Sequence, residues 1–306
     1  MKKQNKILIT GGFGFIGTNL INHLLDQNYE VAIIDNSKNT KFKNVIKYIG
    51  DISDYSFVLK SILDCQPNFV FHLAGFKERS SKVEDINISL QSNLIGSLNI
   101  YQSLLKISCL KSIVTLGTAD EYGINKSLFK ESSIESPISP YGFSKLCNTK
   151  LAAFFYQNYN LPISVLRPTV AFGPHQGLDM FIPSLIQSLI LNKEFKMTSG
   201  NQTRDFIYIS DLIDIMIIIS QSEKSNGQIY NVGSGIKLKL CEVAKSIAKD
   251  LKKESYLKVG AIPYRKNEVM DYSVCIEKIQ TNFNWKPKVD FKKGIELTTN
   301  YFKNNA

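Results

Sequence analysis

Two tyrosine–lysine pairs in the chain have the spacing Tyr-x-x-x-Lys: Tyr141–Lys145 and Tyr122–Lys126. Residues four apart lie on the same face of a helix, so the lysine ammonium of such a pair can lie beside the phenol. The positive charge favours the phenolate and lowers the pKa of the tyrosine. A tyrosine of this kind can transfer a proton near neutral pH, which carbonyl reduction and alcohol oxidation both require.

The neighbouring residues distinguish the two pairs. Tyr141 follows Ser139 and Pro140, which favour the N-cap and the first turn of a helix, and a long stretch with helical spacing follows. Tyr122 is followed by Gly123 and then by a loop rich in Ser and Glu, so no helix is expected to carry Lys126. We therefore predict that Tyr141 and Lys145 are the catalytic pair and interpret Tyr122–Lys126 as a chance match.

A glycine-rich segment near the N-terminus predicts a dinucleotide site. Gly11, Gly14 and Gly17 form G-x-x-G-x-x-G between an expected strand at 6–10 and an expected helix at 15–27. Glycines allow a sharp turn and a close approach of backbone N–H groups to a pyrophosphate, which the helix N-terminus also favours. The next expected strand ends in Asp35, which lies 18 residues after Gly17, where a carboxylate can bind ribose hydroxyls and repel a 2′-phosphate. This favours NAD; the nearby Lys38 keeps NADP as a less favoured alternative.

Strands and helices alternate over the first half of the chain. Expected strands lie at 6–10, 30–35, 45–50, 68–73, 112–116 and 163–167, and expected helices at 15–27, 55–65, 87–106 and 141–159. This alternation predicts an α/β fold with a doubly wound parallel sheet. From residue 168 the elements become shorter, with helices at 181–191, 211–221 and 241–251 and a strand at 205–209. We therefore expect a first domain at 1–167, to which a segment near 205–235 returns, and a smaller C-terminal α/β domain at 168–306.

Composition excludes several other classes of protein. The 306 residues are 43% hydrophobic, enough for a packed core, so intrinsic disorder is not expected. Lys plus Arg number 37 against 27 acidic residues, but only four are Arg and the lysines are scattered, unlike a nucleic-acid-binding surface. Five separated cysteines and three histidines show no familiar zinc spacing, and they suit a reducing compartment. The most apolar window, 212–219, is far shorter than the ~20 residues that span a bilayer. We expect a cytoplasmic protein without metal, membrane or nucleic acid.

Over nearly its whole length the chain resembles the extended short-chain dehydrogenase/reductase family, in the NAD-dependent branch of nucleotide-sugar epimerases, dehydratases and 4-ketoreductases. The similarity implies a Rossmann fold followed by a sugar-nucleotide-binding domain. Its motifs are Thr10–Gly17, Gly50-Asp51-Ile52, Phe71–Gly75, Asn93, Thr118…Tyr122-Gly123, Pro140–Lys145, Leu166–Pro168, Gly173-Pro174 and Gln202–Phe206.

The resemblance also implies roles for individual residues. Thr118 would bond the sugar O4 beside Tyr141 and Asp120, and Arg204 and Arg265 would hold the nucleoside diphosphate of the substrate. The alternative for Arg204 is an ion pair with Asp205 or Asp211, and we expect His72 to be a core residue. The implied cofactor-binding residues are Gly11, Phe13, Gly14, Phe15, Ile16, Gly17, Asp35, Asn36, Asp51, Ile52, Leu73, Ala74, Gly75, Lys77, Asn93, Tyr141 and Lys145.

Departures from the family pattern narrow the expected chemistry. In the 4,6-dehydratases that the chain resembles, an acid or Ser and then a Glu follow the threonine, whereas Ala119 and Asp120 follow Thr118. The segment Thr-Ala-Asp-Glu-Tyr-Gly is closer to that of nucleotide 4-keto-6-deoxysugar reductases. Val170 replaces a substrate-binding Asn of most relatives, so the identity of the substrate stays open.

Reduction of a 4-keto-6-deoxy sugar nucleotide in glycan precursor synthesis is the leading expectation, followed by 4-epimerisation and then 4,6-dehydration. A non-catalytic NAD-sensing or RNA-associated protein is the alternative from another class. Relatives pair through helices corresponding to 87–106 and 141–159, so we also expect a homodimer.

Overall fold

The computed structural model describes residues 5–38, 42–77, 83–125, 127–265 and 267–305, and the chain forms two compact units. Unit 1 comprises Met1–Gly123, Ile134–Arg167 and Ile213–Tyr230; unit 2 comprises Ile124–Ser133, Pro168–Leu212 and Asn231–Ala306. The expected division at residue 168 coincides with the end of the second segment of unit 1. Residues 124–133 differ from the expectation, because buried Phe129 donates its N–H to the Ser273 carbonyl oxygen and so joins unit 2.

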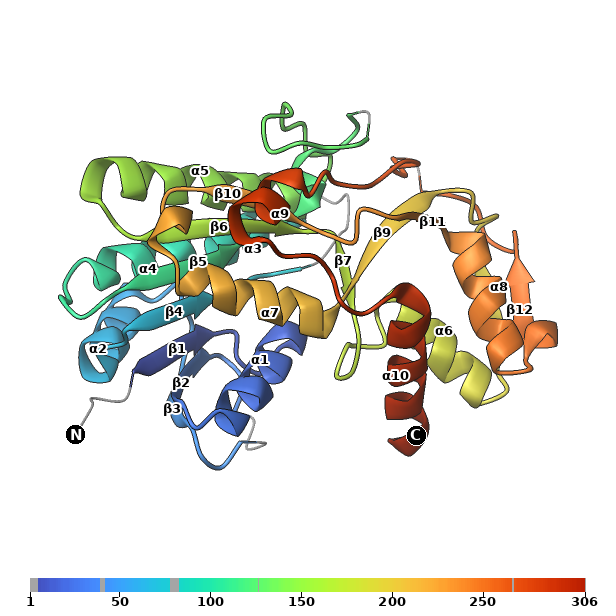
Figure 1. The fold of residues 1–306 in the computed structure, drawn as a ribbon, viewed down its shortest axis with the longest axis horizontal. Helices are drawn as coiled ribbons and strands as arrows, with labels where there is room; N and C mark the ends of the chain where they lie inside the picture. Colours follow the sequence, from blue (N-terminus) through green and yellow to red (C-terminus); the bar gives the residue numbers. More distant parts are fainter. Residues whose placement is uncertain (1–4, 39–41, 78–82, 126, 266, 306) are drawn as a thin grey trace. The chain divides into compact units, whose positions relative to one another are not determined.

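The centre of unit 1, in the described residues, is a seven-stranded sheet in the order β10-β6-β5-β4-β1-β2-β3 (Figure 1). Its strands from β6 to β3 are parallel, so that Ile9 lies opposite Ile33 on one side and Phe71 on the other. The chain builds the sheet outward from β1 in one direction and from β4 in the other, which leaves a crevice at the carboxyl ends of these two strands. The doubly wound prediction is confirmed. The strands are β1 (Lys6–Thr10), β2 (Glu30–Asp35), β3 (Ile46–Ile49), β4 (Phe69–His72), β5 (Ser112–Leu116), β6 (Ile163–Pro168) and β10 (Ile229–Val232).

Both faces of this sheet are covered by helices, which is why its strands are nearly continuous apolar runs. Helices α2 (Tyr55–Cys65), α4 (Gly96–Leu104) and α5 (Pro140–Tyr159) pack on one face, against Leu8, Ile34 and Val70. Helix α1 (Phe15–Asp26) and the second half of α7 (Ile209–Ser220) lie on the other face, where Leu24, Phe71 and Ile217 line one small cavity.

The expected helix at 87–106 is instead three consecutive helical segments. Helix α3 (Glu84–Leu90) is followed by a π-helical turn, Gln91–Ile95, and then by α4. A π-helical turn keeps nearly the same apolar spacing as an α-helix, so the sequence pattern does not reveal it. Such turns are frequent at functional sites.

Helix α5 begins where its sequence predicts. The Ser139 hydroxyl accepts a hydrogen bond of 3.0 Å from the Gly142 N–H, and Pro140 occupies the first turn. The helix ends at Asn160, which adopts a left-handed conformation with φ of 54°. These signals fix the position of Tyr141 in the first turn of the helix.

Unit 2 is a smaller α/β unit with an apolar core of its own. The rings of Phe172, Phe206 and Phe291 pack with centroids 5.4–6.1 Å apart, and a Cβ on Gly294 would lie 2.7 Å from the Phe172 ring. The sequence analysis did not predict several of its elements; most of these are short, but the 14-residue helix Phe291–Asn304 is among them. Its elements are a sheet of β7 (Val170–Phe172), β9 (Thr203–Tyr208) and β11 (Lys237–Lys239), a pair of β8 (Phe195–Met197) and β12 (Leu257–Val259), and helices α6 (Phe181–Ile190), α8 (Leu240–Asp250), α9 (Glu277–Phe283) and α10 (Phe291–Asn304).

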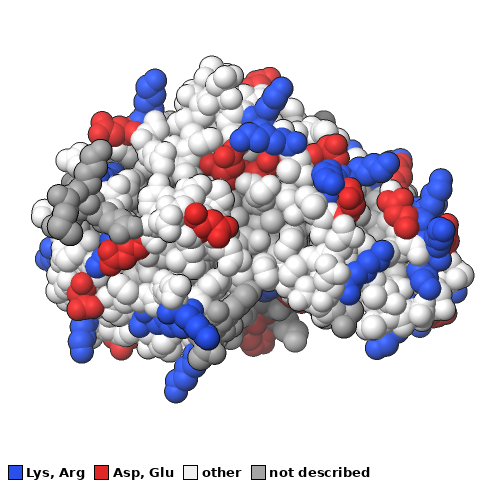
Figure 2. All heavy atoms as spheres, turned by 60° about the horizontal axis from the view of Figure 1, so that its bottom comes forward, with Lys and Arg blue, Asp and Glu red and all other residues white. Residues whose placement is uncertain are grey.

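The surface charges are mixed on the face drawn in Figure 2. Lys and Arg side chains are scattered there and alternate with Asp and Glu, without gathering into one basic patch. Within the described ranges, no helix has the length and apolar character that crossing a bilayer demands.

We predict that Ser139→Ala lowers the free energy of unfolding of unit 1 by about 1 kcal/mol, because the Gly142 N–H loses its cap. Asp54→Ala is the matched control, since the Asp54 carboxylate caps α2 by accepting from the Phe57 N–H at 3.1 Å. Urea unfolding followed by circular dichroism should show comparable losses for both variants. Unchanged stability in Ser139→Ala would contradict the assignment of the cap.

Candidate active site

The glycine loop between β1 and α1 packs tightly against the loop that follows β4. Gly11 has φ of 69°, and a Cβ there would lie 2.7 Å from the backbone of Ala74. A Cβ on Gly17 would lie 2.5 Å from the Gly11 carbonyl oxygen. Gly14 is the N-cap of α1, and no described side chain caps this helix. The first N–H groups of α1 therefore suit an anionic ligand.

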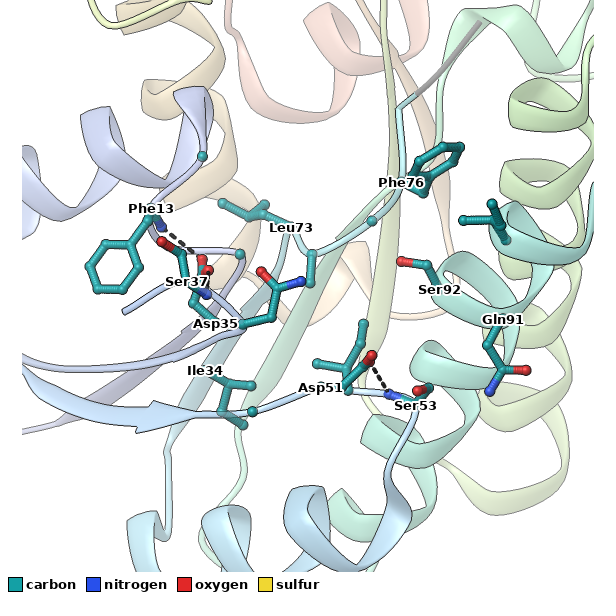
Figure 3. Close-up of a pocket in the computed structure, with 18 of the residues that line it drawn as sticks. Phe13, Ile34, Asp35, Ser37, Asp51, Ser53, Leu73, Phe76, Gln91 and Ser92 are labelled. Atoms are coloured by element: carbon teal, nitrogen blue, oxygen red, sulfur yellow. Dashed lines mark hydrogen bonds between the residues drawn. The ribbon is translucent and has the colours of Figure 1, made fainter. Parts of the chain in front are cut away.

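These two loops border a cavity of about 830 Å³ in unit 1 (Figure 3). Its volume lies in the range of cofactor sites. The predicted cofactor-binding residues that line it are Gly11, Phe13, Gly14, Asp35, Asn36, Asp51, Ile52, Leu73, Ala74 and Gly75.

The Asp35 carboxylate lies at the cavity edge, at the end of β2. Oδ2 accepts from the Phe13 N–H at 3.0 Å, and Oδ1 accepts from the Ser37 N–H at 2.9 Å (Figure 3). These bonds hold the carboxylate between the glycine loop and the residues after β2. Its negative charge there would repel a phosphate group.

The cavity also has a wall that the sequence analysis missed. It is formed by Asn87, Ile88, Gln91 and Ser92, from α3 and the π-helical turn. No sequence signal marks these residues, because the face they present depends on the change of helical period. Other lining residues that were not predicted are Ile34, Ser37, Gly50, Ser53 and Phe76.

Seven of the predicted cofactor-binding residues do not line the cavity: Phe15, Ile16, Gly17, Lys77, Asn93, Tyr141 and Lys145. Phe15, Ile16 and Gly17 form the first turn of α1, and Lys77 is exposed after β4. Asn93 is buried and packs against the loop that follows β4. Its Oδ1 accepts from the Phe76 N–H at 2.7 Å, and its Nδ2 donates to the Phe76 carbonyl oxygen and to the Ser144 hydroxyl. Asn93 therefore ties the cavity wall to α5.

Lys145 is buried one turn after the half-buried Tyr141. Its Nζ donates to the Leu116 carbonyl oxygen at 2.9 Å and lies 3.4 Å from the position of a Cβ on Gly75. The lysine thus reaches the residue at the cavity edge. Burial lowers the pKa of Lys145 to about 8, although the charge of Glu121 acts in the opposite direction.

His72 is buried, as expected for a core residue. Its Nδ1 bonds the Thr10 hydroxyl at 2.7 Å and its Nε2 bonds the Ser97 hydroxyl at 2.8 Å. Burial and the charge of Lys145 lower the pKa of His72 to about 3, so it is neutral at physiological pH.

Thr118 lies in the turn after β5, next to the first turn of α5. Its hydroxyl oxygen accepts from the Asp120 N–H at 3.2 Å and caps a short 3-10 helix, Ala119–Glu121. A Cβ on Gly142 would lie 2.9 Å from the Asp120 carbonyl oxygen, so the turn contacts the helix that carries Tyr141. The structure therefore brings Thr118, Asp120, Tyr141 and Lys145 to the same end of the sheet.

A buried ion pair lies beneath this turn. Glu121 Oε2 bonds Arg167 Nε at 2.7 Å, and both side chains are fully buried. Arg167 also donates to the Tyr122 hydroxyl at 3.0 Å and to Glu135 at 2.8 Å. Tyr122 is thus engaged in the core, while its sequence partner Lys126 lies outside the described residues.

The two arginines predicted to bind substrate belong to unit 2. The Arg204 guanidinium donates to the Thr203 and Val269 carbonyl oxygens, each at 2.7 Å, and forms an ion pair with Glu268. The expected alternative partner Asp205 instead accepts from Ser234 and Gly235. Arg265 is exposed.

The other alternative partner of Arg204 was Asp211, which accepts from the N–H groups of Lys288 and Val289. Glu268 was not predicted because it is 64 residues from Arg204 in the chain. In the part of the chain that the structure describes, no group of three or more His, Cys, Asp or Glu could hold a metal ion.

Comparisons with known proteins agree with this geometry. The model of the NAD dependent epimerase/dehydratase family matches residues 7–233. The dTDP-D-glucose 4,6-dehydratase of Homo sapiens is 27% identical, over 98% of this chain and 90% of the relative. The crystal structure of UDP-glucose 4-epimerase from Thermotoga maritima, with UDP-glucose, has a TM-score of 0.92 and 26% identity, and covers 98% of this chain and 99% of that chain. The UDP-glucose 4-epimerase of Thermus thermophilus in complex with NAD has a TM-score of 0.90 and 25% identity, over 98% of this chain and 100% of that chain.

We predict that Gly11→Ala weakens NAD binding by roughly tenfold or more, because its Cβ would strike the Ala74 backbone at a positive φ. Gly260→Ala is the matched control: its φ of 80° is similar, but nothing lies within 4 Å of the added Cβ. Isothermal titration calorimetry with NAD measures both affinities. Equal affinities in the two variants would show that the close packing at Gly11 does not shape the site.

Proposed function

The chain belongs to the NAD dependent epimerase/dehydratase family, and we propose that it reduces the 4-keto group of a nucleoside-diphosphate 4-keto-6-deoxy sugar. The observation that carries the proposal is the placement of Thr118, Tyr141 and Lys145 at one end of the sheet, where Lys145 reaches Gly75 at the edge of the dinucleotide-sized cavity and Ala119 directly follows the threonine. These groups supply a proton donor and a hydroxyl ligand for O4, without an acid at position 119.

Tyr141 donates the proton that the O4 atom needs when the 4-keto group becomes an alcohol. NADH, when bound, supplies the hydride that adds to C4. Lys145 stabilises the phenolate that remains on Tyr141, because its ammonium lies one helical turn away on the same face. The Thr118 hydroxyl accepts from the Asp120 N–H, so its hydrogen can be donated to O4.

The residues around the cavity fit NAD. The uncapped start of α1 at Gly14 would hold the pyrophosphate, and Asp51 and Ile52 would lie against the adenine. Asp35 would accept from the adenosine ribose hydroxyls and would repel the 2′-phosphate of NADP. Asn93 would keep the wall beside the nicotinamide ribose in place, through its bonds to Phe76.

In unit 2, Arg204 and Arg265 would bind the diphosphate of the substrate, since a guanidinium suits phosphate oxygens. Glu268 already pairs with Arg204 and would hold the guanidinium in a fixed orientation. We propose that unit 2 binds the sugar nucleotide and that unit 1 binds NAD.

Dehydration is disfavoured by the residues that follow Thr118. Removing water across C5 and C6 needs an acid and a base there, but Ala119 cannot donate a proton and Asp120 is one methylene shorter than the usual Glu base. The nearby Glu121 cannot replace them, because both of its carboxylate oxygens are bonded in the core. A non-catalytic NAD-sensing or RNA-associated role would leave the Tyr141–Lys145 arrangement without use.

A UDP-glucose 4-epimerase-like activity is the second candidate. The high TM-scores to epimerases of Thermotoga maritima and Thermus thermophilus favour it. The same Thr118, Tyr141 and Lys145 would serve, with the proton first removed from O4 and later returned. An epimerase would show no net consumption of NADH, which separates it from the reductase.

We also propose a homodimer that works in the cytoplasm. Helix α5 exposes the aromatic rings of Phe143 and Phe154 by 46% and 49%, which suits a helix-to-helix interface. The five cysteines are free thiols, in keeping with a reducing compartment.

Tyr141→Phe is predicted to lower kcat for the 4-keto sugar nucleotide by about 10²- to 10⁴-fold, because it removes the proton donor. The affinity for NADH should change little. Tyr159→Phe is the matched control, since Tyr159 lies on the same helix and is 51% exposed. NADH absorbance measures both rates. Full activity in Tyr141→Phe would refute the mechanism.

The rate of reduction should fall as the pH rises through about 8. Burial sets the pKa of Lys145 near this value, and only its protonated form stabilises the Tyr141 phenolate. Below this pH the ammonium is kept and kcat is level; above it the ammonium is lost. Lys145→Met should be slow at every pH and should lack this decline. A wild-type kcat that stays level up to about pH 10 would contradict the role of Lys145.

A further inference from the structure

The buried pair of Glu121 and Arg167 has a geometry that stability alone does not explain. Both side chains are fully buried, and Arg167 is one of only four arginines in the chain. Replacing a buried ion pair by apolar residues is often neutral or stabilising, because desolvation of the charges offsets their attraction. The contacts of this pair therefore indicate a role other than stabilising the fold.

The two oxygens of the Glu121 carboxylate point to different partners. Oε2 binds Arg167 Nε at 2.7 Å. Oε1 accepts from the Thr118 N–H at 2.9 Å and from the Thr149 hydroxyl at 3.1 Å. One carboxylate thus connects the arginine, helix α5 and the backbone of the residue proposed to bind O4.

The backbone leaves room for this carboxylate. A Cβ on Gly117 would overlap Oε1 of Glu121, so the glycine before Thr118 provides the space that the carboxylate fills. On the other side of Thr118, its hydroxyl oxygen accepts from the Asp120 N–H at 3.2 Å. The backbone N–H and the hydroxyl oxygen of Thr118 are therefore both fixed.

Resting on the proposed function, we propose that Glu121, held by Arg167, is a positioning residue that directs the Thr118 hydroxyl toward O4 of the substrate. Glu121 does not touch the substrate. Its carboxylate fixes the Thr118 N–H, and the Asp120 N–H takes the acceptor side of the hydroxyl. The hydrogen of that hydroxyl is thereby left to be donated to O4.

The electrostatics of the pair agree with this role. Burial raises the pKa of Glu121, and the charge of Arg167 opposes that rise. Arg167 also stacks on the Tyr122 ring, with Cζ 4.8 Å from the centroid, so it is fixed on its other side. A rigid arginine holds the carboxylate in one orientation, which a positioning residue requires.

The test is a double-mutant cycle of Glu121→Gln and Thr118→Ala, measured as kcat near pH 6, where Lys145 keeps its proton. In the wild-type background, Glu121→Gln should lower kcat by roughly tenfold while the KM of the sugar nucleotide changes little. In the Thr118→Ala background, it should lower kcat by less than about twofold, since the hydroxyl to be positioned is gone. An equal tenfold loss in both backgrounds, or no loss in either, would overturn the proposal.

Glu135→Gln is the matched control. It removes a carboxylate from the same arginine, but the described partners of Glu135 are Arg167 and Lys150, not Thr118. Its kcat should stay within about twofold of the wild type. A tenfold loss in Glu135→Gln as well would indicate general damage to the core and would overturn the proposal. If Glu121→Gln does not fold, Glu121→Asp takes its place in the cycle, because it keeps the charge and shortens the side chain.

Failure of the proposed function can be distinguished from failure of this inference. The cycle applies to whichever C4 activity the wild type shows, reduction or epimerisation. If the wild type shows neither, the proposed function has failed. The ¹³C-methyl resonance of Thr118 then tests the positioning directly: a shift in Glu121→Gln but not in Glu135→Gln supports it, and an unchanged resonance overturns it.

Discussion

The hydrogen bond from the Lys145 ammonium to the Leu116 carbonyl oxygen is the contact on which the candidate site depends. It joins α5, which carries Tyr141, to the end of β5, which leads into the turn that contains Thr118. A buried ammonium needs bonded partners, because burying an unpaired charge costs several kcal/mol. The carbonyl at the end of a parallel strand meets this need without adding a negative charge that would compete with the proposed Tyr141 phenolate.

The charged groups around Lys145 favour its protonated form. Burial lowers its pKa, while Glu121 acts to raise it. His72, buried on the neighbouring strand, has a pKa of about 3 and therefore adds no positive charge near neutral pH. Glu121 thus has two connections to the site: a hydrogen bond from the Thr118 N–H and an electrostatic effect on Lys145. On the proposed function, these connections give a reason for charged residues at these buried positions.

The parts of the fold that depend on local signals could be predicted from the sequence. The glycine loop, Asp35 at the end of β2 and the Ser139-Pro140 start of α5 each follow from the chemistry of a few adjacent residues. The π-helical turn at Gln91–Ile95 could not be predicted in this way, because its apolar spacing resembles that of an α-helix. The ion-pair partners of Arg167 and Arg204 could not be predicted either. Glu121 is 46 residues from Arg167 and Glu268 is 64 residues from Arg204, so only the tertiary fold brings each pair together.

Isotope transfer can show whether hydride is delivered to C4 of a nucleotide sugar, as we propose. The protein would be incubated with NADH deuterated at the transferred position and with 4-keto-6-deoxy sugars carried on UDP, dTDP, GDP or CDP. For one of these substrates we expect one deuterium at C4 of the product for each NADH consumed. Deuterium at another carbon, or sugar conversion without any consumption of NADH, would contradict this proposal.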